Sequence, residues 1–389
     1  MILEQKISHI IIFLFSLISL TEIGIQFQGD GISIGYFYIF LPFILILFDK
    51  NRQMQINKDL LYILTILFVI FLVGYGDITN SSSSEFRRIG SFFTMIFPFA
   101  IAFLNPDKQD LYSFKLAVVI SCLLYSLINI FDLIEWVFFI GADYVDLKGR
   151  IGSQRYGFIL LLGFYIVLLD KNIFYKKGVW IVMLKYLSLV VIFFGLMLTY
   201  SKTTIISLIF TSLILLLSSF KHTLKLNYKK MGFYAIIFLI LSYFLLLIYK
   251  EQLIHALSFD YRNFESSLGE RVNLINLAFI HLSENPFFGS SYRGIYVLFD
   301  HLNGGSAHNQ YLDIILRTGI VGLVIFLYLF FKILYKLSSL DKGLFFGFIS
   351  ILVVGFMHET FKLSWGSFVF GFILAAVYSK NLYSEINNN

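Results

Sequence analysis

Long apolar runs alternate with short polar segments along the whole of this 389-residue chain. A helix needs about 20 mostly apolar residues to cross the hydrocarbon core of a bilayer. Runs of about this length predict twelve transmembrane helices, and the predicted fold is therefore all-α, that of a polytopic integral membrane protein. The spans are expected near residues 9–26, 33–48, 60–75, 89–104, 111–131, 155–169, 180–199, 204–220, 231–249, 311–331, 343–357 and 363–379.

The largest predicted loop, residues 250–310, separates the ninth and tenth of these spans. Apolar residues recur at helical spacing from Glu270 to Leu282, and Pro286 and Gly289 then end the pattern. A helix is therefore expected inside the loop. Since no linker and no internal repeat divides the chain, we expect a single membrane domain, 1–389, that carries this loop.

Composition agrees with a membrane protein, because 58% of the residues are hydrophobic and only 14% are charged. Such a chain has too little polar surface to cover a soluble globule. The first apolar run, Ile10 to Ile25, ends without a small-residue cleavage pattern, so we expect it to remain as a span. The single cysteine, Cys122, cannot form an intrachain disulfide and does not indicate a compartment.

Lysines set the predicted orientation, because cytoplasmic loops of membrane proteins are enriched in positive charge. The basic clusters that fall in alternate loops are Lys50, Arg52 and Lys58; Lys171, Lys176 and Lys177; Lys221, Lys225, Lys229 and Lys230; and Lys332, Lys336 and Lys342. Both termini are therefore expected in the cytoplasm, and the 250–310 loop on the outer face. The sequence pI near 9.0 then reflects lysines that face anionic membrane lipid, and nucleic acid is not expected as a partner.

Arginines show the opposite distribution, which the enrichment of positive charge in cytoplasmic loops does not explain. Eight of them are expected outside or at outer span ends: Arg87, Arg88, Arg150, Arg155, Arg262, Arg271, Arg293 and Arg317. A guanidinium group binds phosphate through two parallel hydrogen bonds, which lysine cannot do. For any one arginine, pairing with an outer acidic residue is an equally good explanation. For the set of eight, we favour an anionic ligand on the outer face.

Arg271 lies in the first turn of the helix expected in the loop, where free backbone N–H groups also favour an anion. The alternative is an ion pair with the neighbouring Glu270 or Glu265 at a solvated helix start. The charge pattern favours a phosphate-binding role for Arg271 over this pairing.

Three C-terminal motifs together resemble the O-antigen polymerase and O-antigen ligase superfamily. They are GERVNLINLAF, with Arg271 at a helix start; the PFFG turn; and AHNQYLDIILRTGIVG, in which His308 leads a span containing Gly319 and Gly322. The combination of motifs carries the resemblance, which covers the C-terminal third of the chain well. Residues 1–140 match the family only in hydropathy.

Two shorter segments extend the resemblance. GRIGSQRYG, residues 149–157, is similar to the Arg-x-x-Gly segment of the family at the outer end of a span. TYSKTTIISL, residues 199–208, is similar to its Ser-Arg segment, except that Lys202 stands at the arginine position. This departure keeps the positive charge but loses the planar fork of the guanidinium.

The resemblance implies transfer of a glycan from a polyprenyl-diphosphate carrier to a hydroxyl acceptor, without a metal or any other cofactor. It also implies a location in the bacterial inner (cytoplasmic) membrane. An imidazole, whose pKa is ordinarily about 6.5, suits the general base of this reaction, and we assign His308 to it. Fixed cations would stabilise the departing diphosphate. We assign Arg271 and Arg155 first, then Arg150 and Lys202.

A simpler role for His308 is helix capping, in which its ring or the side chain of Asn309 satisfies free N–H groups at the start of the 311–331 helix. Gly319 and Gly322 are interpreted as packing glycines that let another helix approach. The remaining histidines have no metal-ligand spacing, and we predict no metal site. His358 and Glu359 are interpreted as a short polar turn between the last two spans.

Three functions remain open. The compact Ala-His-Asn-Gln-Tyr-Leu segment favours a polymerase of polyprenyl-diphosphate-linked oligosaccharide repeats, in O-antigen or capsule synthesis. An O-antigen ligase, which transfers the glycan to a lipid A core, would use the same groups. A transporter of lipid-linked oligosaccharides would place cations deep in the spans, whereas here they gather at the outer ends. A protein that regulates chain length is left open as a partner.

Overall fold

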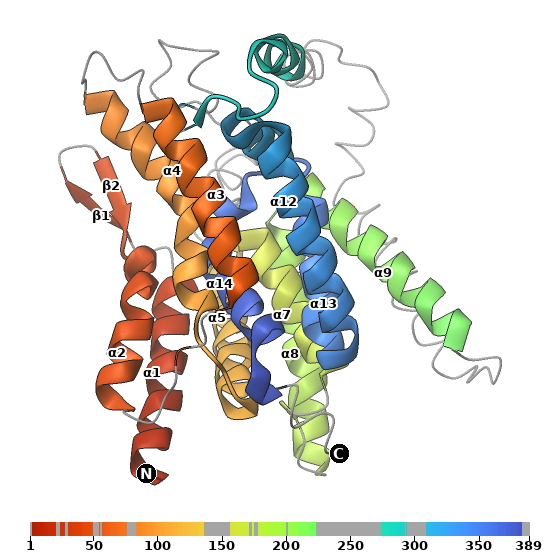
Figure 1. Ribbon diagram of the computed structural model, residues 1–389. Coiled ribbons are helices and arrows are strands. Elements are labelled where there is room, and N and C mark those ends of the chain that lie inside the picture. Colours follow the sequence, from red (N-terminus) through yellow and green to blue (C-terminus); the bar gives the residue numbers. More distant parts are fainter. Residues whose placement is uncertain are drawn as a thin grey trace, which may run out of the picture.

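A computed structural model of the chain describes residues 2–20, 24–27, 30–49, 54, 57–75, 83–135, 156–170, 173–174, 178–199, 201–222, 274–291, 293 and 309–382. Apart from one small hairpin, its regular elements are helices (Figure 1). The helices of the N-terminal half are α1 (Ile2–Leu20), the 3-10 helix η1 (Ile34–Phe40), α2 (Leu41–Phe48), α3 (Lys58–Tyr75), α4 (Ser83–Ala102) and α5 (Lys108–Glu135). Those that follow are α7 (Gly157–Leu169), α8 (Val179–Leu198), α9 (Lys202–His222), the helix Leu274–Glu284, α12 (Gln310–Leu340), α13 (Lys342–Val354), η5 (Thr360–Lys362) and α14 (Ser364–Tyr378).

The all-helical membrane class is confirmed, while the count of twelve spans stays a prediction. Apart from 231–249, which lies outside the described residues, each predicted span coincides over most of its length with a helix. Within the described residues, three helices are long and apolar enough to cross a membrane: residues Lys108–Ile134 of α5, then α8 and α12. The others are shorter apolar helices.

An antiparallel hairpin follows α1, which was not expected from the sequence. Strand β1 (Gly24–Phe27) pairs with β2 (Asp30–Ser33), with Gly24 opposite Ser33 and Phe27 opposite Asp30. The predicted first span, 9–26, therefore ends earlier than its hydropathy suggests, because Gly24 to Phe27 form a strand.

The helices pack into one bundle in which α14 lies against α4, α13 against α7 and α1 against α5. Its core is strongly aromatic: the Phe114 and Phe372 rings stack with centroids 4.2 Å apart, and Phe361 and Phe370 lie 4.7 Å apart. Large apolar side chains also face outward, for example Trp180 on α8, which is 81% exposed. Lipid covers such a surface in a membrane protein.

Buried polar contacts join the helices near one end of the bundle. The Lys115 ammonium group on α5 donates hydrogen bonds to Asp170, which follows α7, and to Asp341, which precedes α13, the latter at 2.6 Å. Ion pairs of this kind fix helices relative to one another when both charges are satisfied. The start of α1 and the end of α14 lie at the same end of the bundle (Figure 1), as termini on one side of a membrane require.

The helix α12, which contains the predicted span 311–331, is broken at Gly319. This glycine has a φ of 62° and a ψ of −164°, which is not helical. The Tyr311 and Phe330 rings lie 6.3 Å apart, although in a straight helix these residues would be about 28 Å apart. The chain therefore folds back at Gly319. We call residues 310–318 the short arm of α12 and residues 320–340 its long arm.

The span predicted over 311–331 therefore lies in a helix that is broken at Gly319. Residues 310–318 form an arm beside the long arm, and the long arm by itself has the length of a transmembrane helix. The start of α12 consequently lies part of the way along the bundle and not at its tip.

Candidate functional site

Most of the predicted site residues lie outside the described residues, but several of their neighbours in the sequence are described. His308, Arg271, Arg155 and Arg150 lie outside the described residues, and Lys202 is described only as the first residue of α9. Three of these five residues are nevertheless followed directly by described residues, namely Tyr156 after Arg155, Thr203 after Lys202 and Asn309 after His308. Tyr156, Thr203 and Asn309 each make contacts that the structure describes.

The start of α12 is fixed by its own cap and by the turn between α13 and α14. The Asn309 side chain accepts hydrogen bonds from the N–H groups of Tyr311 and Leu312, both at 2.9 Å. The Gln310 N–H donates to Gly355 O at 2.7 Å, and its side-chain oxygen accepts from Phe361 N at 2.8 Å. Asn309 therefore caps α12, which is one of the two forms of capping that the sequence suggested, by His308 or by Asn309.

The start of α9 reaches the same turn. Thr203 Oγ1 and His358 Nε2 are 3.4 Å apart and form a hydrogen bond. Ser201, directly before α9, accepts a hydrogen bond from Thr204 N through its side chain at 3.3 Å. Lys202 is therefore held between a helix cap on one side and the contact to the 355–362 turn on the other.

The start of α7 completes the arrangement. A methyl group placed on Gly157 would come within 2.1 Å of Thr204 Oγ1, so α7 and α9 begin in direct contact. Tyr156, just before α7, stacks on Tyr125 of α5 with ring centroids 4.1 Å apart. We call the meeting point of the starts of α7, α9 and α12 with the 355–362 turn the junction.

The junction brings together sequence segments that the motifs had only suggested separately. Arg155 and His308 each stand two residues before one of its helices in the sequence, and Lys202 is the first residue of α9. Arg150 lies further along the chain from α7, and no described contact fixes its position. At the starts of α9 and α12, N–H groups that lack partners within the helix are bonded to Ser201, Asn309 and Gly355 instead, and are not available to an anion.

The PFFG turn, residues 286–289, is hydrogen-bonded to α12 at its break. Ser290 N donates to Leu316 O at 2.7 Å, and Ile320 N donates to Pro286 O at 2.9 Å. These bonds cross the break on both sides and satisfy backbone groups that Gly319 leaves without helical partners. Gly289 also has a φ of 62°, and its position leaves no room for a side chain beside Leu316 O.

The prediction that Gly319 and Gly322 admit another helix is therefore wrong. Gly319 is approached by the backbone of Phe287, since a methyl group there would lie 2.3 Å from that carbonyl carbon. At Gly322 the nearest atoms belong to Thr318 of the same helix. The turn that follows the Leu274–Glu284 helix docks on the break, so both family motifs act as one structural unit.

Arg317 has a structural role, and the phosphate interpretation does not extend to it. Its side chain is fully buried in the short arm, and its Nε lies 3.0 Å from both carboxylate oxygens of Asp313, one turn earlier. A buried guanidinium requires a paired carboxylate, because an uncompensated charge is costly. Among the outer arginines, Arg317 therefore follows the ion-pair alternative.

His358 and Glu359 were interpreted as a short polar turn that could also approach the site, and His358 does lie at the junction. The structure places it against Thr203, beside Lys202, and the same turn holds Glu359 and Lys362 in an ion pair at 2.9 Å. No sequence signal joins residues 155 positions apart, so only the fold could bring His358 to the junction.

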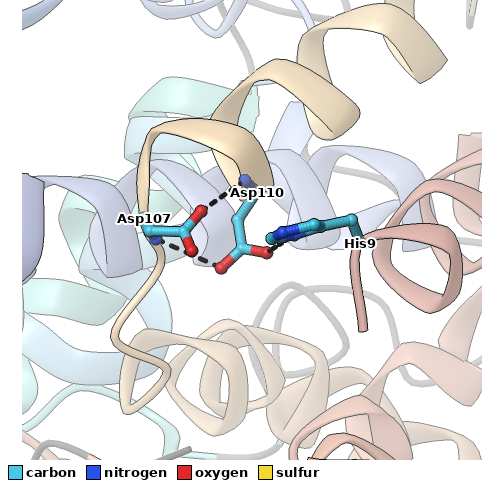
Figure 2. A group of neighbouring side chains, drawn as sticks. All are labelled: His9, Asp107 and Asp110. Carbon is cyan, nitrogen blue, oxygen red and sulfur yellow. Dashed lines mark hydrogen bonds and ion pairs between the residues drawn. The ribbon is translucent and has the colours of Figure 1, made fainter. Parts of the chain in front are cut away.

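Within the described residues, His9, Asp107 and Asp110 form a group close enough to share a metal ion, with ligand atoms within 4.8 Å of one another (Figure 2). Their hydrogen bonds account for this closeness. The N–H groups of Asp107 and Asp110 each donate to the carboxylate of the other, and His9 Nδ1 lies 2.7 Å from Asp110 Oδ1. This arrangement caps the start of α5 and attaches it to α1.

The helices and their apolar surfaces define a polytopic membrane protein. Residues 187–327 match a family model described as O-Antigen ligase. This match confirms the resemblance to the O-antigen polymerase and ligase superfamily, whose members transfer glycosyl groups. It includes Lys202, Arg271 and His308, and it excludes Arg150, Arg155 and His358. No curated protein matches the chain.

Proposed function

We propose that this protein polymerises oligosaccharide repeat units carried on polyprenyl diphosphate, at the outer face of the bacterial cytoplasmic membrane. The observation that carries the proposal is the junction, where the starts of α7, α9 and α12 meet. Arg155 and His308 stand two residues before α7 and α12 in the sequence, and Lys202 is the first residue of α9. A base and several cations would thereby be placed around one point from segments far apart in sequence.

In the proposed reaction, His308 takes the proton of the acceptor hydroxyl as its oxygen attacks the anomeric carbon of the donor. The new glycosidic C–O bond forms as the bond from that carbon to the diphosphate breaks, and the diphosphate leaves with the electron pair. Arg271, Arg155, Arg150 and Lys202 would stabilise the charge on the departing diphosphate. Because Asn309 caps α12, the imidazole of His308 is not required for the helix.

The acceptor distinguishes polymerase from ligase. A polymerase uses the terminal sugar of another carrier-linked repeat, whereas a ligase uses a lipid A core, and the base and cations serve equally well in both. The compact segment that follows His308 favours the polymerase. A chain-length regulator would then be a natural protein partner. The non-enzymatic transporter is less well supported, since the predicted cations gather around helix starts and do not line a path through the spans.

The deciding experiment is the glycan profile of a strain that lacks this protein. Loss of a polymerase leaves surface lipid carrying single repeats, because ligation continues without elongation. Loss of a ligase leaves full-length chains on the carrier lipid, and loss of a transporter leaves single repeats on the carrier in the inner leaflet. Complementation with the wild-type gene controls for effects on neighbouring genes.

A further inference from the structure

His358 lies at the junction, yet the proposed reaction gives it no role. Its half-buried imidazole belongs to the 355–362 turn and stands beyond residues 187–327, which match the family model. His358 Nε2 is 3.4 Å from Thr203 Oγ1, and Thr203 directly follows Lys202 in the sequence. The contact therefore joins the last inter-helix turn to the helix start that carries a predicted diphosphate-binding residue.

The turn that presents His358 is attached to the start of α12. Gln310 bonds to this turn through both its backbone and its side chain, as described above, and the Tyr311 hydroxyl donates to Leu352 O at 2.7 Å. The Tyr311 ring also lies 4.5 Å from the Phe356 ring, between centroids. The position of His358 is thus set by the residues that begin α12.

On its other side, His358 meets the start of α9. Ser201 caps this helix through the bond from Thr204 N, and one turn further along Ser207 donates to Ser350 O of α13 at 2.7 Å. The contact between Thr203 and His358 lies at the end of this helix pair where Lys202 begins α9. A continuous set of contacts therefore runs from the start of α12, through the turn and His358, to the start of α9.

We infer that His358 is a positioning residue, which fixes the start of α9, with Lys202, relative to the start of α12, which His308 precedes. The inference rests on the proposed function, because it concerns the same site. A base and a cation that act on one anomeric carbon must keep a set separation, and a small displacement is costly in rate. A threonine hydroxyl both donates and accepts, so the bond to His358 persists whether or not the imidazole is protonated. His358 acts through this bond and not by transferring a proton.

Three substitutions of His358 separate these roles. The bond uses Nε2, the ring nitrogen farther from the backbone, which the amide of glutamine can replace and the shorter asparagine cannot. His358→Gln should therefore keep the wild-type kcat, whereas His358→Asn and His358→Phe should lower kcat about tenfold. The assay is polymerisation by the purified protein in lipid nanodiscs, and the substrate is carrier-linked repeat units extracted from the deletion strain.

Tyr36→Phe is the matched control for loosening of the turn. The Tyr36 hydroxyl donates to Lys362 O at the other end of the same turn, away from α9. Its removal costs the turn one hydrogen bond but leaves the contact between Thr203 and His358 in place. This variant should keep the wild-type kcat, and a tenfold loss here would overturn the specific role of His358.

A double-mutant cycle tests whether His358 acts through Thr203. Thr203→Val removes the hydroxyl at nearly constant volume and should by itself lower kcat about tenfold. Combined with His358→Phe, the loss should remain about tenfold, because both residues act through one bond. A loss of about a hundredfold in the double variant would overturn the inference, as would inactivity of His358→Gln, which would indicate an imidazole that transfers a proton. Failure of the proposed function shows elsewhere: a deletion strain that still makes full-length polymer refutes polymerisation whatever the cycle gives.

Discussion

Asn309, which directly follows His308 in the sequence, caps α12. Asn309 accepts two backbone hydrogen bonds at the start of α12, and Gln310 holds the same point against Gly355 and Phe361. The cap is therefore made by Asn309. His308 lies outside the described residues, and its role as the base stays a prediction.

Replacing His308 should remove activity without removing the protein. As the general base it would contribute roughly 10² to 10⁴-fold in rate, so His308→Asn, His308→Gln and His308→Ala should all leave single repeats in a complemented deletion strain. Each variant should reach the membrane at the wild-type level, as measured by immunoblot of the membrane fraction.

The matched control for this experiment is Asn309→Ala. Loss of the cap should lower stability by about 1 kcal/mol, so this variant should unfold at a lower temperature yet retain polymerisation per molecule. Long chains produced by His308→Asn would contradict the base assignment, because asparagine caps a helix but cannot take up a proton at neutral pH.

Arg271→Lys tests whether a planar fork is needed at the start of the Leu274–Glu284 helix. Lysine keeps the charge but cannot form two parallel hydrogen bonds with a phosphate. We expect activity to fall more than tenfold, since one charge-assisted hydrogen bond is worth about 1.5 to 3 kcal/mol. Polymer formation per unit of protein is the measurement, and Arg52→Lys in a predicted cytoplasmic loop is the control. Near-normal activity of Arg271→Lys would favour a surface ion pair with Glu270 or Glu265.

At the scale of elements, α12 owes its shape to one glycine and one turn. The left-handed backbone at Gly319 lets the short arm fold back, and the Pro286 and Leu316 carbonyls accept hydrogen bonds across the break. Apolar side chains cover both arms, so hydropathy alone gave a continuous span from 311 to 331. A glycine at a break and a glycine at a packing contact have the same signature in a sequence.

Gly319→Ala should therefore destabilise the protein. A side chain in the left-handed region costs about 1 to 2 kcal/mol, and a methyl group here would also lie 2.3 Å from the Phe287 backbone. We expect a loss of at least about 2 kcal/mol, seen as a lower thermal unfolding temperature in detergent. Gly178→Ala is the control, because no atom lies within 4 Å of a methyl group there and its backbone is extended. An unchanged unfolding temperature for Gly319→Ala would contradict the fold-back of α12.

At the scale of the whole molecule, the apolar runs placed the helices well because length and hydropathy are local properties. The junction could be anticipated only in part. Family motifs indicated the starts of α7, α9 and α12, but nothing local in the sequence shows that Thr203 contacts His358 or that Gln310 contacts Phe361. Such contacts depend on how the helices pack, as does the burial of Arg317 against Asp313.

Orientation in the membrane is the prediction that affects the whole molecule. Ser283→Cys on the predicted outer face should react with a membrane-impermeant thiol reagent in intact spheroplasts. Ser338→Cys, near the end of the long arm of α12, should react only after the membrane is permeabilised. Both serines are exposed helical residues, and the native Cys122 is buried and contributes little background. Reversed labelling would place the candidate site on the cytoplasmic side and contradict the proposed reaction.

The fold-back of α12 also has a consequence for biogenesis. Residues 310–340 leave the ribosome as one apolar stretch, yet only the long arm is needed to cross the bilayer. Asp313 and Arg317 are one turn apart, so their charges can neutralise each other as soon as the short arm is helical. The PFFG turn is synthesised before the arm and is already available to receive it. The short arm can therefore dock against protein after insertion, without its charges having to enter lipid unpaired.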